Sequence, residues 1–141
     1  KRYDRLVIRN VLVIDGKGTP MRGPLDVIVE GDKIASVTGA DARPGAYKNE
    51  AHVLDGTGMY LLPGFINSHI HLHDERAGMA QPFEYEYKVY LACGVTTVRD
   101  VGSDPKKALA ERRKSQEGSI VAPRIYVYMV AGGRTPEEGR K

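Results

Sequence analysis

The sequence predicts an α/β protein in two parts, an all-β segment over residues 1–60 and strands that alternate with helices over residues 61–141. Two observations predict this division. Short runs rich in valine and isoleucine, separated by glycine and proline, fill the first part, as strands and tight turns require. In the second part such runs alternate with segments of helical periodicity, which is the pattern of parallel βαβ units.

The first part is expected to hold four strands with short connections. The strands are predicted where β-branched residues cluster, at positions 6–14, 25–30, 33–38 and 51–54. Gly31 and Asp32 lie between the second and third runs, and this pair supplies the positive φ that a tight hairpin turn demands. Residues 41–47 have the composition of a loop.

The second part begins with a strand that leads into three histidines, and a polar loop is predicted over residues 74–81. Pro82 suits the first position of a helix, which Gly94 is expected to end as a left-handed cap. One face of that helix carries apolar side chains at helical spacing, namely Phe83, Tyr87, Tyr90 and Leu91. This stripe predicts core packing rather than a cofactor site.

Two further strand–helix units follow, and each helix start carries a capping residue and a proline. The expected elements are a strand at 95–98, a helix from Pro105 to Gly118 capped by Asp104, a strand at 125–130, and a helix capped by Thr135 with Pro136 next. Glu138 stands three residues after Thr135, as a capping box requires. The chain ends about one turn later, whereas isolated helices need about 12–15 residues for marginal stability, so a truncated chain is expected.

Composition excludes several classes of protein. The 21 basic and 18 acidic residues are interspersed along the chain and give a net charge of +3, without a basic stripe for nucleic acid. No run approaches the roughly 20 apolar residues of a membrane helix. The single cysteine, Cys93, excludes an internal disulfide, and its apolar neighbours predict a small buried helix residue.

Three of the four histidines stand at alternate positions after a Pro-Gly turn, at 69, 71 and 73. Alternate side chains of a strand share a face, so residues 67, 69, 71 and 73 are expected on one face and residues 66, 70 and 72 on the other. Two such imidazoles start about 6.6 Å apart and can converge on one ion, because each nitrogen–zinc bond spans about 2.0–2.1 Å. An exposed polar strand face is the alternative, but the apolar run that precedes the histidines favours a metal site.

The segment Leu62–Leu72, Leu-Pro-Gly-Phe-Ile-Asn-Ser-His-Ile-His-Leu, resembles the strand-one signature of the amidohydrolase superfamily of metal-dependent hydrolases. Further similarity, most of all to members that act as Xaa-Pro or Xaa-Arg dipeptidases, lies in Val53–Gly64, Cys93–Asp100 and Ala122–Val127. The resemblance implies that His69 and His71 are metal ligands and leaves His73 outside the motif. Asn67 stands where the family usually has Asp, and its amide can still form hydrogen bonds.

The resemblance implies both a fold and a chemistry. The fold is the first three βα units of a (β/α)8 TIM barrel, preceded over residues 1–60 by part of a small β-sandwich domain, and a complete barrel needs about 250 residues. The chemistry is hydrolysis of a C–N bond, with acylated amino acids or dipeptides as expected substrates, by water activated on one or two divalent ions, with zinc expected. The remaining ligands and the general base are expected beyond Lys141. A deaminase, a cyclic-amide hydrolase or a catalytically silent scaffold subunit are the alternatives.

Other expectations concern the substrate and the partners. His73 and Arg76 are candidate substrate-binding residues, because the first lies beside the predicted ligands and the second lies in the first βα loop. Arg99 and Asp100 end the second strand, where an ion pair or a hydrogen-bonded strut is expected. The expected partners are a small-molecule substrate, further copies of the full-length protein in a homo-oligomer and the remainder of the barrel, with neither nucleic acid nor membrane. A soluble, cytoplasmic protein is expected, with a cleaved secretory signal as the alternative because the chain begins without Met.

Overall fold

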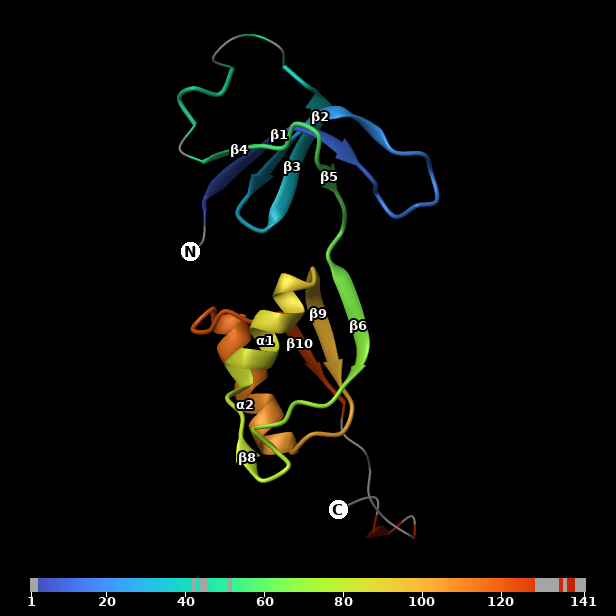
Figure 1. Cartoon of the computed structure of the whole chain (residues 1–141), viewed down its shortest axis with the longest axis vertical. Helices are drawn as coiled ribbons and strands as arrows, with labels where there is room; N and C mark the ends of the chain where they lie inside the picture. Colours follow the sequence, from blue (N-terminus) through green and yellow to red (C-terminus); the bar gives the residue numbers. More distant parts are fainter. Residues whose placement is uncertain are drawn as a thin grey trace. The chain divides into compact units, whose positions relative to one another are not determined.

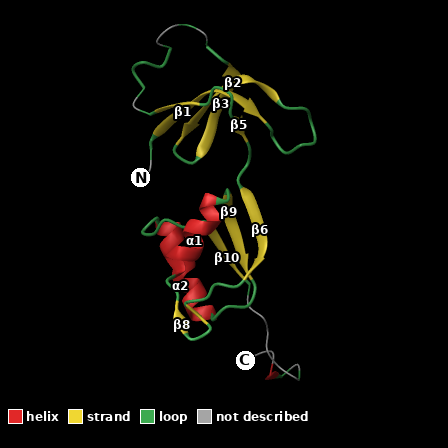
Figure 2. Cartoon of the chain, in the orientation of Figure 1, coloured by secondary structure: helices red, strands yellow, loops and turns green. Residues whose placement is uncertain are grey.

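The chain divides into two units, residues 1–63 and 64–141, in the computed structural model. The structure describes residues 3–41, 43, 46–50, 52–128, 135, 137 and 138. Figure 1 labels the elements of both units, and Figure 2 distinguishes helices, strands and loops. None of the helices within the described residues is long and apolar enough to cross a membrane.

A mixed sheet forms the first unit. Its strands are β1 (Arg5–Val13), β2 (Arg22–Glu30), β3 (Lys33–Gly39), β4 (Val53–Asp55) and β5 (Tyr60–Leu61). The sheet has the order β3-β2-β1-β4, and β5 also pairs with β1. β2 runs antiparallel to β1 and β3, whereas β4 and β5 run parallel to β1. The four predicted strands are confirmed, although the fourth begins at Val53 and residue 51 of its predicted range lies outside the described residues. β5 is an addition too short to have a sequence pattern of its own.

Burial in this sheet follows the β-branched positions, with Val7 and Val27 almost fully buried. Asp26 is buried beside them in β2. Its carboxylate accepts hydrogen bonds from the backbone N–H groups of Asn10 and Asp41, both at 3.0 Å. These bonds satisfy a buried carboxylate and attach β1 and the segment after β3 to β2.

Three parallel strands and two helices form the second unit. The strands β6 (Phe65–Ile70), β9 (Val95–Asp100) and β10 (Arg124–Val127) lie in the order β10-β9-β6. The helices α1 (Phe83–Ala92) and α2 (Pro105–Glu117) follow β6 and β9 and lie on one side of the sheet (Figure 1). The predicted alternation of strands and helices is therefore confirmed. Closure of a barrel, and a sandwich in the first unit, stay predictions.

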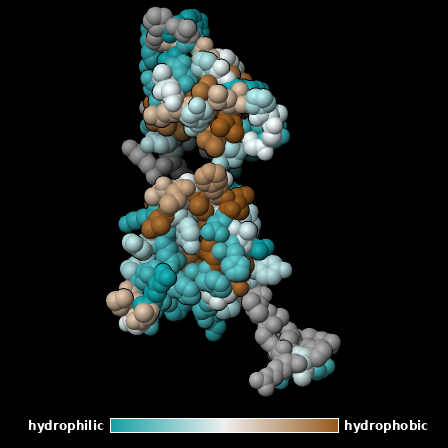
Figure 3. All heavy atoms as spheres, turned by 45° about the vertical axis from the view of Figure 1, so that its right-hand side comes forward, coloured by the Kyte–Doolittle hydropathy of each residue, from teal (hydrophilic) through white to brown (hydrophobic). Residues whose placement is uncertain are grey.

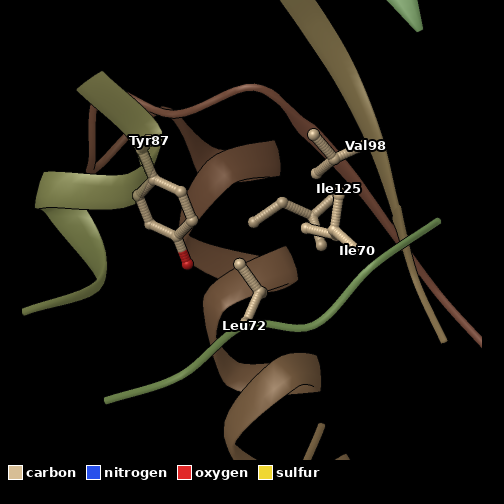
Figure 4. Packing of buried hydrophobic residues seen from close by; sticks show 5 residues of the cluster. All are labelled: Ile70, Leu72, Tyr87, Val98 and Ile125. Carbon is tan, nitrogen blue, oxygen red and sulfur yellow. The ribbon is translucent and has the colours of Figure 1, made fainter. Parts of the chain in front are cut away.

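Tyr87 of α1 is the largest fully buried side chain in the core of the second unit. The other members of this cluster come from the strands and from the segment after β6; they are Ile70, Leu72, Val98 and Ile125 (Figure 4). Phe83 and Tyr90 pack against the cluster, which confirms three of the four residues of the predicted stripe as core, whereas Leu91 is half-buried and outside the cluster. The Tyr87 hydroxyl donates to Oε2 of buried Glu111 at 3.0 Å, so a buried hydrogen bond joins α1 to α2.

Most of the predicted helix ends are confirmed. The Asp104 carboxylate accepts a hydrogen bond from the Lys107 backbone N–H at 2.9 Å, and α2 begins at the predicted position. Gly118 ends α2 with a φ of 68°, and Gly94 follows α1 with a φ of 75°. Pro82 is the cap of α1 rather than its first helical residue, because its ψ of 135° is extended.

Two features of the second unit differ from the sequence-based expectation. The segment predicted as a polar loop, residues 74–81, contains a short antiparallel hairpin of β7 (Glu75–Arg76) and β8 (Met79–Ala80). Cys93 is exposed rather than buried, because it lies at the end of α1 directly before the Gly94 cap and not inside the helix.

The predictions for the C-terminal segment fall only partly on described residues. β10 ends at Val127, and residues 129 and 130 of the predicted strand lie outside the described residues. The Thr135 hydroxyl accepts a hydrogen bond from the Glu138 backbone N–H at 3.3 Å, as predicted for the cap of a last helix. Of the rest of that predicted helix, the structure describes only Glu137 and Glu138.

Candidate metal centre

The histidines lie at the carboxyl end of β6, where the strand is irregular. Asn67 pairs with Val98 of β9, and Ile70 pairs with Asp100, so three steps along β6 match two steps along β9. One extra residue in β6 forms a β-bulge at this point. His69 lies within the bulged stretch, directly before the strand ends.

Because of the bulge, the predicted division of β6 into two faces is wrong for Ile66 and Asn67. Ile66 was expected to share a face with Ile70, but Ile66 is 71% exposed and lines a hollow with Arg99, whereas Ile70 is 4% exposed in the core. Asn67 was expected opposite Ile70, but the two pair with alternate residues of β9 and so share a face. An extra residue shifts the two-residue alternation, so one period cannot describe the strand on both sides of the bulge.

The exposed rings of His69 and His71 lie side by side, with centroids 5.3 Å apart and planes at 63°. Two imidazoles bound to one tetrahedral zinc ion would have centroids about 5.2 Å apart, because each nitrogen lies about 2.0–2.1 Å from the ion and about 1.1 Å from its ring centre. The spacing of the two ring centres is therefore compatible with a shared divalent ion. His73 stacks on His71, with centroids 6.0 Å apart and planes at 13°.

Two imidazoles are an incomplete set of ligands for a catalytic ion, which generally has three protein ligands. Among the residues that the structure describes, no group of three or more His, Cys, Asp or Glu side chains is placed to hold a metal ion. His73 therefore does not complete the set, although it lies next to the pair.

Asn67 supports the backbone of the bulge. Its Oδ1 accepts a hydrogen bond from the His69 N–H at 3.2 Å, a local side-chain-to-backbone bond that Asn and Asp both form readily. The predicted hydrogen-bonding role of this amide is confirmed. The carboxylate that the family usually has at this position is not needed for this bond.

Arg99 and Asp100 lie on opposite sides of the sheet at the end of β9. Asp100 is 1% exposed, and its Oδ1 accepts hydrogen bonds from the N–H groups of Gly102 and Ser103 and from the Ser103 hydroxyl. The exposed Arg99 donates from Nε to a carbonyl oxygen of β6 at 2.7 Å, and its guanidinium lies 5.7 Å from the centre of the Tyr128 ring. The predicted strut is confirmed, and Asp100 forms it with the following loop.

Sequence reasoning missed a hollow of about 390 Å³ on the sheet face that carries Arg99. Its polar and aromatic lining comes from all three strands and includes Ser68, Thr97, Arg124, Tyr126 and Tyr128. The alternation of Tyr126 and Tyr128 with apolar residues was the signal that could have indicated this face, because alternate residues of a strand lie on the same side.

Arg76, predicted to bind substrate, is exposed in the hairpin after β6 and lines a second hollow of about 690 Å³ with Met79 and Tyr85. The structure does not bring His73 into this hollow.

Asp74 forms an ion pair with Lys107 of α2, and the hydrogen bond from Lys107 lowers the pKa of the Asp74 carboxyl. This pair attaches the base of the hairpin to the start of α2.

No protein-family model matches the chain, but curated proteins do. The dihydroorotase of Thermus aquaticus is 41% identical over 69 residues, which are 49% of this chain and 14% of that protein. The dihydroorotase of Aquifex aeolicus is 31% identical over 94 residues, 67% of this chain and 21% of that protein. An adenine deaminase of Edwardsiella ictaluri is 35% identical over 94 residues, 66% of this chain and 14% of that protein. The chain thus spans about a fifth or less of the length of these relatives.

Solved structures match a larger share of the chain. A prolidase candidate from Bifidobacterium longum has a TM-score of 0.76 at 27% identity, over 98% of this chain and 37% of that one. Phenylurea hydrolase B has a TM-score of 0.74 at 32% identity, over 92% of this chain and 32% of that one. The fold also matches that of an Xaa-Pro dipeptidase, with a TM-score of 0.75 at 22% identity, over 97% of this chain and 37% of that one. Taken with the strand signature around His69 and His71, these matches show that the chain belongs to the amidohydrolase superfamily.

Proposed function

We propose that the chain is part of a metal-dependent hydrolase that cleaves a C–N bond, with His69 and His71 as two of the protein ligands of the metal. The observation that carries this proposal is the 5.3 Å spacing of two exposed imidazoles at the carboxyl end of β6. In barrel enzymes the catalytic groups gather at that end of the strands. The names of the relatives, among them dihydroorotase, allantoinase and phenylurea hydrolase, support this class of reaction.

The contribution of this chain to the chemistry is a pair of neutral imidazole nitrogens, since a protonated imidazole cannot bind a cation. When bound to these nitrogens, a divalent ion would supply a water of lowered pKa, about 7, and would polarise a carbonyl group. Zinc suits these donors, and one or two ions are proposed. We assign the remaining ligands and the general base to parts of the protein beyond this chain.

Exposed apolar strands support a larger protein around these two units. Apolar residues, brown in Figure 3, reach the surface of each unit, and Ile34 of β3 and Ile66 of β6 are 68% and 71% exposed. Large apolar side chains on a sheet normally lie against a second layer. The remainder of a barrel and of a sandwich would supply these layers, in agreement with the greater length of the relatives.

The proposed substrate is an acylated amino acid or a dipeptide. The match to the Bifidobacterium longum prolidase candidate, which extends over 98% of this chain, supports this class. His73 lies against His71, and Arg76 is exposed on the hairpin that follows β6. We assign both to substrate contact, because a guanidinium can pair with the terminal carboxylate of such a molecule.

A cyclic-amide hydrolase or a deaminase is the second candidate. Two dihydroorotases and an adenine deaminase match this chain at 31% to 41% identity, although over shorter stretches than the solved structures. A subunit that keeps the fold without catalysis is the third candidate. These candidates differ in the substrate that is consumed, so a substrate panel separates them.

The test is the double replacement His69→Ala and His71→Ala in the complete protein. Bound metal, measured by plasma mass spectrometry, and hydrolysis of N-acyl amino acids and Xaa-Pro dipeptides are expected to disappear together. His52→Ala is the matched control, because it removes the fourth histidine from the other unit and should change neither quantity.

Stoichiometric metal in the double variant would overturn the assignment of ligands. If the unaltered protein consumes dihydroorotate, allantoin or adenine and leaves dipeptides intact, the second candidate replaces the first. If it binds metal and hydrolyses no member of the panel, the scaffold candidate replaces both.

A further inference from the structure

The loop that follows β9 contacts the histidine segment through Ser103. The Ser103 Oγ accepts a hydrogen bond from the Leu72 N–H at 2.6 Å, and the same hydroxyl bonds to Asp100 Oδ1 at 2.7 Å. A hydroxyl has one proton, and an ionised carboxylate can only accept. The chain of bonds therefore runs from the Leu72 N–H to the Ser103 hydroxyl and from that hydroxyl to Asp100.

This chain of hydrogen bonds begins at the backbone N–H of Leu72, between His71 and His73. The N–H of Leu72 belongs to the peptide group that directly follows His71, so a bond to it sets the orientation of that peptide plane. The Leu72 side chain is 4% exposed and belongs to the core. The backbone at this point is thus held by the core and by Ser103, while the ring of His71 stays exposed.

Gly102 forms a second contact, directly beside the His71 ring. A Cβ at Gly102 would lie 2.6 Å from both Nδ1 and Cε1 of His71, and 3.9 Å from Nε2. No side chain therefore fits at this position without moving the ring. The Nδ1 edge faces the loop, and the Nε2 edge is turned farther from it.

We infer that the loop from Asp100 to Ser103 positions His71 for metal binding through Nε2. The hydrogen bond from the Leu72 N–H to Ser103 orients the backbone next to His71. The absence of a side chain at Gly102 leaves room for the His71 ring beside the loop. This inference rests on the proposed function, which makes His71 a ligand. Asp100, Gly102 and Ser103 are positioning residues, since they act on the ion only through His71. Groups that hydrogen-bond to the ligating side chain itself commonly change metal affinity 10- to 100-fold, and we expect an effect of this order from the loop.

The test measures cobalt(II) binding to the complete protein, by the dissociation constant and by the visible absorption spectrum of the bound ion. Ser103→Ala removes the hydroxyl and is expected to weaken binding about 10- to 100-fold and to shift the spectrum. Ser103→Thr keeps a hydroxyl and is expected to restore most of the affinity. Gly102→Ala places a Cβ against the ring and is expected to weaken binding by a similar factor.

Two matched controls separate positioning from a general loss of stability. Ser115→Ala removes a hydroxyl that donates to the Pro123 carbonyl oxygen at 2.8 Å in the same unit, at the other end of α2. Gly39→Ala adds a methyl group where nothing lies within 4 Å of the new Cβ. Both controls are expected to bind cobalt as the unaltered protein does, with an unchanged spectrum.

The outcomes distinguish the inference from the function on which it rests. If His71→Ala abolishes cobalt binding but Ser103→Ala and Gly102→Ala bind as tightly as the unaltered protein, the inference is wrong and the ligand assignment stands. If His71→Ala keeps its cobalt, the ligand assignment fails and the inference fails with it. Should Ser103→Ala not fold, unchanged affinity in Gly102→Ala overturns the inference by itself.

Discussion

Replacing Tyr87 with Phe tests the buried hydrogen bond between α1 and α2. The ring stays in the core, and only the hydroxyl that donates to Glu111 at 3.0 Å is lost. Burial, and secondly the charge of Glu111, raise the pKa of Tyr87, so the hydroxyl keeps its proton as a donor. Glu111 is 5% exposed, and a hydrogen bond to a charged group contributes about 1.5–3 kcal/mol. The free energy of unfolding is therefore expected to fall by about 2 kcal/mol.

Urea denaturation followed by circular dichroism measures this change. The free energy of unfolding falls by about 1–3 kcal/mol for each 1 M increase in urea concentration. A loss of about 2 kcal/mol therefore lowers the urea concentration at the unfolding midpoint by about 1 M. Tyr85→Phe is the matched control, since it removes the same atom from the same helix at a position that is 63% exposed. It is expected to change stability by no more than about 0.5 kcal/mol. Equal midpoints for the two variants would refute the reasoning, because Glu111 would then not depend on the Tyr87 hydroxyl.

Two other changes test local structure. Asp104→Ala removes the acceptor of the Lys107 N–H at the start of α2 and is expected to lower stability by about 1 kcal/mol, whereas Asp104→Ser should keep most of it, as urea midpoints would show. The Arg43 side chain, and then its backbone N–H, lower the pKa of the Asp41 carboxyl to about 2. A lowered carboxyl pKa stabilises the folded state above the unfolded pKa, which is about 3.9, so this contribution is expected to vanish as the pH falls from about 4 to about 2. Asp41→Asn should remove that part of the acid dependence of the urea midpoint, and an unchanged profile would contradict the assignment.

Features that depend on a few neighbouring residues could be predicted from the sequence. The cap of α2 needs only Asp104 and the three residues that follow it, and the helix ends at Gly94 and Gly118 need only a residue that adopts positive φ easily. Apart from β5, β7 and β8, the strands of both units followed from β-branched composition or from the strand signature, and the core stripe of α1 followed from helical spacing.

Three kinds of feature could not be predicted: those that depend on a partner strand, strands of two residues, and exposure at the end of a helix. The bulge in β6 exists only relative to β9, so the regular two-residue period gave Ile66 and Asn67 the wrong faces. The β7–β8 hairpin has two residues in each strand, too few for an alternating pattern. Cys93 has the apolar neighbours of a buried residue, but its position at the end of α1 exposes it.

The candidate site likewise contains residues that the sequence predicts and contacts that it does not. His69 and His71 could be selected from their spacing and their neighbours in sequence, and the structure places their rings together. The contact from Ser103 to Leu72 joins residues 31 positions apart, and the contact from Gly102 to His71 also requires β9 to end beside β6. A pattern within one segment of the sequence contains no information about such contacts.

The extra residue of β6 keeps Asn67 and Ile70 on one face of the sheet although three positions separate them in the sequence. Deleting one residue between them would leave two steps along β6 against two along β9, which is regular pairing. Ile70 would then still lie opposite Asp100 and still enter the core, whereas the irregular backbone that carries His69 would be lost. Such a deletion is therefore expected to spare the core and to change the placement of the His69 ring.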